Sequence, residues 1–381
     1  MRVGTPSVTG GALRFGLEHE FRVREGDRTR DFRTMVHGLG LGQCDLDPAD
    51  PNAYRLPSGA AVTCDGAEAE VALPPTTVAP GFALDVAARA EKEACALGDR
   101  LSDGVSLTGC STHLSVSVPD GLTQAVCRLY TTSFAPALML LVDGPQSPGL
   151  LIRPRPGRVE LGGEFVAGPN LVAATLFAVA SVVACRDAVS AGGRLHRALP
   201  ELVVRVAPAV ERFGWYVDRT AFGGDLYADG RAATLTTLQG DRLSAQEHLT
   251  RCWATVAGRL DNVAYPEERE LVDAVVRGAR SLPSEGASDE AGTMAAVDVA
   301  PSPYGAASSP WSGDGFDLAP VMVTWDLVVF LAVESRKRRR AFIAVPGLEL
   351  GTFFDDLLLG RMEDPIARWF DRRGQRRRLV D

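Results

Sequence analysis

Residues 13–23 alternate almost without a break between apolar and polar side chains, which is typical of a strand with one buried face and one polar face. The polar face would carry Glu18 and Glu20 about 6 to 7 Å apart. Two carboxylates at that spacing suit a pair of ligands for a hard divalent cation. An amphipathic edge strand whose charges are simply solvated explains the same segment equally well.

Three later segments repeat this alternation. Residues 68–73, 112–118 and 158–164 each have apolar side chains on one face and acids, a histidine or an arginine on the other. If the strands lie side by side, their polar faces form one surface, which carries Glu18, Glu20, Glu68, Glu70, His113 and Glu160. Neighbouring carboxylates cannot all stay ionised unless cations neutralise them. Oxygen ligands with a single imidazole suit Mg²⁺ or Mn²⁺ rather than a structural zinc ion.

Three arginines stand next to the last of these segments. Arg153 and Arg155 fall in a stretch that its prolines predict to be a loop, and Arg158 opens the segment itself. Arginine binds phosphate oxygens through paired N–H groups. Acids for cations beside arginines for a polyphosphate indicate a phosphoryl-transfer site without a glycine-rich phosphate loop.

Two other reactive side chains have a structural interpretation. His19 lies on the apolar face of its strand, and we expect it to pack in the core. Cys110 has no paired histidine and aspartate nearby in the sequence, so a buried thiol is expected rather than a nucleophile.

The composition limits the class of protein. A chain of 381 residues with 46% hydrophobic residues can bury a large core, and a net charge of −8 argues against a general nucleic-acid binder. Seven scattered cysteines without a CxxC pair argue against thiolate metal sites and a disulfide framework. The apolar run 171–185 is short for a membrane span and no signal-peptide pattern opens the chain, so we expect a cytoplasmic protein that makes no membrane contact.

The order of elements predicts an α+β fold, with a mainly antiparallel sheet that has an open polar active-site face and helices packed on its other face. A further strand is expected at 60–64, and a hairpin from 215–217 and 231–238. Helices are expected at residues 82–101, 122–141, 170–190, 244–260 and 266–282.

The chain is expected to have four parts. Residues 1–200 form a catalytic sheet domain with the metal and nucleotide site, and 201–280 complete the same domain. The stretch 281–317, dominated by small residues, proline and aspartate, is expected to be a flexible linker or lid. Residues 318–381 form a C-terminal segment in which the basic run 336–340 is expected at a helix end and 372–378 in a solvated basic tail.

Three motifs, in order, resemble those of the glutamate–cysteine ligase and glutamine synthetase superfamily of carboxylate–amine ligases, which includes Pup ligase and the Pup deamidase. Residues 16–21 (GLEHEF) are similar to its Gly-x-Glu-x-Glu-Phe strand, residues 109–113 (GCSTH) to its Gly-x-His-x-His strand, and residues 158–160 (RVE) to its Arg-x-Glu strand. The resemblance covers about residues 11–170 and implies a glutamine synthetase-like catalytic fold. The chain departs from the pattern in having one histidine at 113, Gly162 in place of an arginine, and no match beyond residue 200.

The resemblance also implies roles for individual residues. Glu20, Glu68 and Glu70 would bind or adjoin the metal near a substrate carboxylate. Glu18, His113 and Glu160 would hold a metal on the nucleotide phosphates. Arg158 and, more loosely, Arg153 and Arg155 would act catalytically by steadying the transferred γ-phosphoryl group.

The activity implied by the resemblance is an ATP- and Mg²⁺-dependent ligation, in which a carboxylate is phosphorylated and an amine then displaces phosphate to form an amide. The expected substrates are a small-molecule carboxylate and amine, and a protein or peptide substrate is also compatible with the sequence. A phosphotransferase or an amide-cleaving enzyme on the same fold is the first alternative. The missing histidine and Gly162 motivate a second, a non-catalytic nucleotide-binding regulator.

Overall fold

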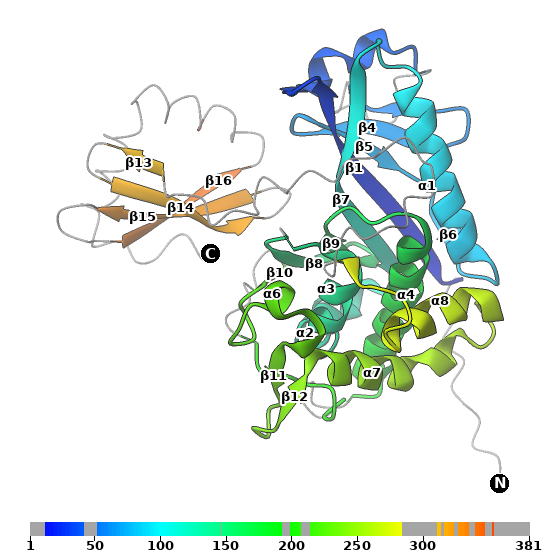
Figure 1. Cartoon of the computed structure of the whole chain (residues 1–381), viewed down its shortest axis with the longest axis vertical. Helices are drawn as coiled ribbons and strands as arrows, with labels where there is room; N and C mark the ends of the chain where they lie inside the picture. Colours follow the sequence, from blue (N-terminus) through cyan, green and yellow to red (C-terminus); the bar gives the residue numbers. More distant parts are fainter. Residues whose placement is uncertain are drawn as a thin grey trace. The chain divides into compact units, whose positions relative to one another are not determined.

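The structure is a computed structural model of the chain. It describes residues 12–41, 52–145, 147–192, 199–206, 214–283, 311–313, 316–323, 327–334, 340–346 and 353. The chain divides into two compact units, Met1–Ser302 and Pro303–Asp381 (Figure 1).

The first unit is built on an antiparallel sheet of ten strands. Its main path runs in the order β10-β8-β9-β7-β1-β5-β4-β3, and β2 and β6 also pair with β1. Figure 1 shows the long strand β1 lying beside β7 and β5. The strands are β1 (Arg14–Glu25), β2 (Arg28–Arg30), β3 (Tyr54–Arg55), β4 (Ala61–Asp65), β5 (Glu68–Ala72), β6 (Thr76–Thr77), β7 (Val105–Ser117), β8 (Gly149–Arg155), β9 (Arg158–Gly163) and β10 (Trp215–Asp218). A separate pair joins β11 (Thr234–Thr236) to β12 (Arg242–Ser244).

The helices cover one face of this sheet. They are α1 (Phe82–Gly98), α2 (Thr123–Ser133), α3 (Ala135–Val142), α4 (Gly168–Ser190), α6 (Leu226–Asp229), α7 (Ala245–Val256) and α8 (Pro266–Val276). The apolar faces of the strands and helices meet in one hydrophobic cluster, to which the sheet contributes Phe15, Leu114 and Val159. The opposite face carries the acids and arginines, so the predicted α+β fold with one polar sheet face is confirmed.

Helix α4 lies at the centre of this packing. By length and composition it could cross a bilayer, with 23 residues, but 78% of its most apolar stretch is buried inside the fold. It contacts α1, α2, α3 and α8. A helix that is apolar on all sides is expected to be buried on all sides, and α4 accordingly forms the centre of the helical layer.

Three local predictions were wrong. The helix expected at 122–141 is two helices, α2 and α3, bent by 75° where Pro136 removes a backbone donor. The stretch with Arg153 and Arg155 is strand β8 rather than a loop. The hairpin expected from 215–217 and 231–238 does not form, because β10 pairs with β8 and β11 pairs with β12.

The helix α6 explains the failed hairpin. Asp225 caps this helix by accepting hydrogen bonds from the backbone N–H groups of Tyr227 and Ala228. Arg219 binds the same carboxylate at 2.8 Å and donates to the carbonyl of Ser147. These contacts stabilise a long loop containing α6, where the sequence had predicted a tight hairpin turn.

The second unit contains a four-stranded antiparallel sheet in the order β13 (Trp311–Gly313), β14 (Phe316–Val323), β15 (Leu327–Glu334) and β16 (Arg340–Pro346). Phe330, Ile343 and Val345 are buried, and the rings of Phe330 and Phe353 stack with centroids 5.0 Å apart. Of the basic run 336–340, expected at a helix end, only Arg340 is described, and it begins strand β16; residues 336–339 lie outside the described residues. Most of the linker expected at 281–317, namely 284–310, and the basic tail at 372–378 lie outside the described residues.

Candidate active site

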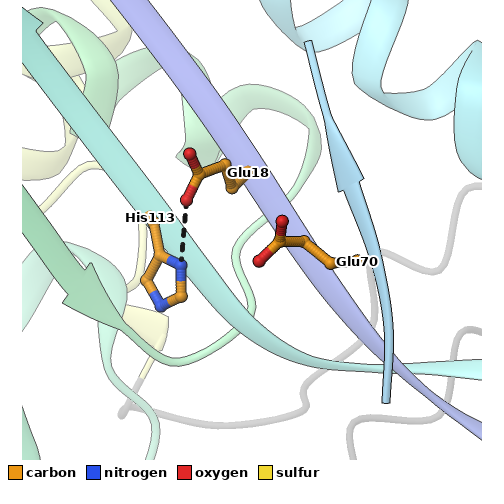
Figure 2. A group of neighbouring side chains, drawn as sticks. All are labelled: Glu18, Glu70 and His113. Atoms are coloured by element: carbon orange, nitrogen blue, oxygen red, sulfur yellow. Dashed lines mark ion pairs between the residues drawn. The ribbon is translucent and has the colours of Figure 1, made fainter. Parts of the chain in front are cut away.

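Strand register brings the acids of β1 together with those of its two neighbours. Glu18 lies directly opposite His113 of β7, and Glu20 lies opposite Glu70 of β5. Side chains opposite one another in an antiparallel pair share a face of the sheet. Figure 2 shows Glu18, Glu70 and His113 directed toward one another from three different strands.

Two groups of side chains could each hold a metal ion. In the first, Glu18, Glu70 and His113 offer ligand atoms that all lie within 4.8 Å of one another. In the second, Glu20, Asp65 and Glu70 do the same. Glu70 belongs to both groups. This arrangement could therefore hold two cations on either side of one shared carboxylate.

The donor atoms fit Mg²⁺ or Mn²⁺. Five of the six ligand positions, counting Glu70 once in each group, are carboxylate oxygens and the other is an imidazole nitrogen. The Oε1 atom of Glu20 is buried without a hydrogen-bond partner among the described residues, and it lies 3.7 Å from Nδ1 of His113. A buried carboxylate oxygen with no donor is costly unless a cation approaches it.

The orientation of His113 is set by a serine two residues earlier. The hydroxyl of Ser111 donates to the carbonyl of Gly163 at 3.2 Å and lies 2.9 Å from Nε2 of His113. Since its hydrogen is used, the Ser111 oxygen accepts the Nε2 hydrogen, and Nδ1 is directed at Glu18 at 3.6 Å. Partners of this kind fix the tautomer and direction of metal-binding histidines.

Gly162 leaves the space that the His113 ring occupies. A Cβ atom at position 162 would lie 2.8 Å from Cδ2 of His113. Any larger residue there, including an arginine, would push the ring away from Glu18. The glycine at this position, which departs from the superfamily pattern, thus fits the geometry of His113.

Burial and mutual repulsion raise the pKa values of several of these acids. Burial, followed by the charges of Glu18 and Asp65, raises the pKa of Glu70 to about 8. Burial also raises the pKa values of Glu20, Asp65 and Glu68. A cation bound among them would replace protons on these acids.

Glu18 behaves differently from its neighbours. Burial acts to raise its pKa, but the neighbouring His113, together with the charges of Arg158 and Arg153, leaves the pKa below its ordinary value. Glu18 is therefore the acid of the group that most readily stays ionised.

The arginines gather around Glu160 on the adjoining strands. Arg153 and Arg155 of β8 and Arg158 of β9 all form ion pairs with its carboxylate. The charges of Arg158 and Arg153 help to lower the pKa of Glu18. The polar face therefore has an acidic half and a basic half in contact.

The predicted metal ligands are distributed unevenly over this surface. We call the two groups of possible metal ligands described above the metal-type groups. Among the described residues, these groups contain four of the predicted ligands, Glu18, Glu20, Glu70 and His113, whereas Glu68 and Glu160 belong to neither group. Glu68, the first residue of β5, lies opposite Asp65, the last residue of β4. The metal and nucleotide roles of all these residues remain predictions.

Asp65 is the site residue that the sequence interpretation missed. It ends β4, where Val62 is buried, so the alternation places Thr63 and Asp65 on the polar face. The strand was expected to end at residue 64. Continuing the same alternation by one residue would have identified Asp65.

The expected packing of His19 in the core is confirmed. His19 is buried against Phe165, with ring centroids 4.6 Å apart, and burial lowers its pKa to about 3. Cys110, expected to be a buried thiol, is only partly buried; it lies where the pairing of β7 with β1 shifts register, and burial raises the pKa of its thiol. Neither group suits a catalytic role at neutral pH.

Comparisons with known proteins were made at the level of family, sequence and structure. No protein-family model and no curated protein sequence matches the chain. Among solved structures, it is similar to the Pup ligase PafA in complex with the prokaryotic ubiquitin-like protein Pup (TM-score 0.38, 12% identity, 70% of this chain covered). It is also similar to PafA in complex with ADP (TM-score 0.34, 10% identity, 65% covered). The chain spans 64% of the length of each PafA chain.

Proposed function

We propose that the protein is an ATP- and Mg²⁺-dependent carboxylate–amine ligase that forms an amide bond through an acyl phosphate. The observation that carries the proposal is the convergence, on one sheet face, of two acidic groups sharing Glu70 with a basic group around Glu160. The three sequence motifs shared with the glutamate–cysteine ligase and glutamine synthetase superfamily support the same activity.

Each half of the face has a role in this proposal. Glu18, Glu70 and His113 would hold one cation, and Glu20 and Asp65 would hold a second together with Glu70. Bound Mg²⁺ would supply positive charge that offsets the repulsion between an anionic carboxylate and the triphosphate. Arg155 and Arg158, both partly exposed, would bind phosphate oxygens.

The reaction has two steps. A substrate carboxylate oxygen attacks the γ-phosphorus of ATP, and the bond to ADP breaks as the acyl phosphate forms. An amine nitrogen then attacks the acyl carbon, phosphate leaves, and the nitrogen gives up a proton. The arginines stabilise charge on the transferring phosphoryl group, and no covalent bond to the protein is required.

The decisive experiment is a screen of carboxylate and amine pairs, both small molecules and peptides, with ATP and Mg²⁺. We expect release of ADP only when a suitable acid and amine are both present, and mass spectrometry should find their amide. A phosphorylated product or a cleaved amide would instead identify the phosphotransferase or amide-cleaving alternative. Protein that binds no ATP at millimolar Mg²⁺ would contradict the proposal.

A control variant separates an enzyme from a regulator. Glu18→Ala removes a ligand of the first metal-type group and should abolish turnover if the protein is an enzyme. The exposed Glu91, on α1, offers a matched control, since Glu91→Ala should leave activity unchanged. A non-catalytic regulator would show no turnover in the wild-type protein or in either variant.

A further inference from the structure

Glu160 lies at the centre of the three arginines, and both of its carboxylate oxygens accept hydrogen bonds. Its side chain is 1% exposed. Arg153 donates from Nε to Oε1 at 3.0 Å, and Arg155 donates from Nε to Oε2 at 3.1 Å. Arg158 approaches Oε2 to within 3.7 Å. Both carboxylate oxygens therefore already accept hydrogen bonds from protein donors.

Strand register builds this cluster into the sheet. Glu160 of β9 lies directly opposite Arg153 of β8, and Arg158 lies opposite Arg155 two residues further along the ladder. The four side chains thus occupy alternate pairs of one antiparallel ladder, which share a face of the sheet. Their proximity follows from the backbone pairing rather than from a chance contact of long side chains.

The cluster carries an excess of positive charge that is partly accessible. Three guanidinium groups against one carboxylate leave two positive charges. The Arg153 side chain is 4% exposed, whereas those of Arg155 and Arg158 are 34% and 40% exposed. Each guanidinium has five N–H donors in a planar fork, so the two exposed arginines have donors to offer to an anion.

Glu160 adjoins the metal-type groups, and its charge adds to the effect of burial in raising the pKa of Glu70, but it is not one of the described residues that form them. Along the sheet, Glu18 pairs with His113, and His113 pairs with Gly162, two residues from Glu160. Among the described residues, Glu160 contributes no ligand atom to either group. Its surroundings are cationic, which disfavours the approach of a metal ion.

We propose that Glu160 is a positioning residue that holds Arg155 and Arg158 in place to bind the polyphosphate of a nucleotide, and that it is not a metal ligand. This role rests on the proposed function, since it assumes that a nucleotide polyphosphate binds at this face. It replaces the metal role that the resemblance implies for Glu160 with one derived from its contacts.

The test compares metal binding and nucleotide binding in matched variants of the full chain. Mn²⁺ alone is titrated into wild-type, Glu18→Gln and Glu160→Gln proteins and followed by electron paramagnetic resonance. Glu18→Gln should weaken Mn²⁺ binding by about tenfold to a hundredfold, whereas Glu160→Gln should stay close to wild type. Calorimetric titration with Mg–ADP should then show a loss of about tenfold or more for Glu160→Gln, because the arginines are no longer held.

A second variant keeps the test valid if Glu160→Gln is unstable. Losing the carboxylate leaves Arg153 as a buried charge without its main counterion, which should lower the melting temperature. The double variant Arg153→Met with Glu160→Gln removes both charges and should recover much of the loss. It is expected to bind Mn²⁺ like wild type and Mg–ADP more weakly.

The outcomes separate the two proposals. Loss of Mn²⁺ affinity in Glu160→Gln to the extent seen in Glu18→Gln would overturn the positioning role and make Glu160 a metal ligand. Mg–ADP affinity that matches wild type in the variants would also overturn it, while leaving the proposed function intact. Wild-type protein that binds Mn²⁺ but no Mg–ADP would overturn both proposals.

Discussion

Glu70 is the side chain on which the acidic half of the site depends. It is the only described residue common to both metal-type groups, and burial raises its pKa to about 8. In the absence of a cation, folding therefore favours the protonated form of this acid. Cation binding and the protonation of Glu70 oppose each other, which makes the stability of the protein sensitive to both pH and Mg²⁺.

We predict that metal-free protein loses stability as the pH rises from 7 to 8.5. Because the folded-state pKa of Glu70 is about 8 and its ordinary value is 4.5, the folded protein binds more protons than the unfolded chain between these values. Its contribution is fully present below pH 4.5 and is lost as the pH passes through 8. The buried histidines do not mask the effect, since the pKa values of His19 and His248 are about 3 and about 4.

Scanning calorimetry in the presence of EDTA measures this effect. The melting temperature should fall over this pH range, and Mg²⁺ should raise it more at pH 8.5 than at pH 7. Glu70→Gln should flatten the pH dependence, while Glu91→Gln, at an exposed position, should retain it. A melting temperature that is equally pH-dependent in wild type and Glu70→Gln would contradict the account.

A second prediction concerns the space beside His113. Gly162→Ala places a Cβ atom 2.8 Å from the imidazole ring, so we expect a loss of about 1 to 3 kcal/mol in the free energy of unfolding together with weaker Mn²⁺ binding. Gly121→Ala is the matched control, because a Cβ atom there meets nothing within 4 Å. Urea unfolding and Mn²⁺ titration check both effects. Equal behaviour of the two variants would refute the packing argument.

At the level of strands and helices, the position of each site residue follows from strand pairing. β1 contributes Glu18 and Glu20, β5 contributes Glu70, and β7 contributes His113. A shift of one residue in any of these pairings would turn the acids toward the core. The large apolar face of the sheet, buried under the helices, therefore fixes the register that assembles the polar face.

The helical layer has its own buried carboxylate, Glu268 of α8. It accepts hydrogen bonds from the backbone N–H groups of Gly81, Ala83 and Leu84 at the start of α1, at 3.0 to 3.2 Å, and from that of Tyr265 at 2.7 Å. One side chain thus caps two helices and joins them. This contact joins segments 184 to 187 residues apart in sequence and satisfies backbone donors at the start of α1.

We predict that Glu268→Ala lowers the free energy of unfolding by about 3 kcal/mol, because it leaves backbone donors of two helices without an acceptor. Glu267→Ala, at the neighbouring exposed position, should change stability little. Urea denaturation of both variants gives the comparison. A small effect of Glu268→Ala would mean that water replaces the carboxylate at the start of α1.

Across the molecule as a whole, the sequence predicted what local periodicity encodes. The alternation in β1, β5 and β9 identified the strands, their buried faces and most of the acids that converge. It recognised only the second half of β7, because a register shift at Cys110 breaks the alternation there. Strand β8 was missed because Pro154 and Pro156 beside the arginines favour a loop.

Two short hairpins were not predicted in full from the sequence. Strand β8 pairs with β9 across a turn at residues 156–157, which places Arg153 against Glu160, but the prolines beside the arginines favoured a loop in place of β8. The pairing of β4 with β5, which brings Asp65 to the site, is of the same kind. The sequence therefore predicted the polar face and most of its charged residues, while the pairing of those residues into an acidic and a basic half emerged only in three dimensions.

The convergence of the acids can be measured directly by counting bound Mn²⁺ ions with electron paramagnetic resonance. We predict two ions in wild-type protein, close enough for their spins to couple, because Glu70 belongs to both groups. Glu70→Gln should weaken both sites, whereas Glu18→Gln should weaken only one. Mn²⁺ binding that is absent from the wild type, or unaffected by Glu70→Gln, would show that these acids do not form a shared cation site.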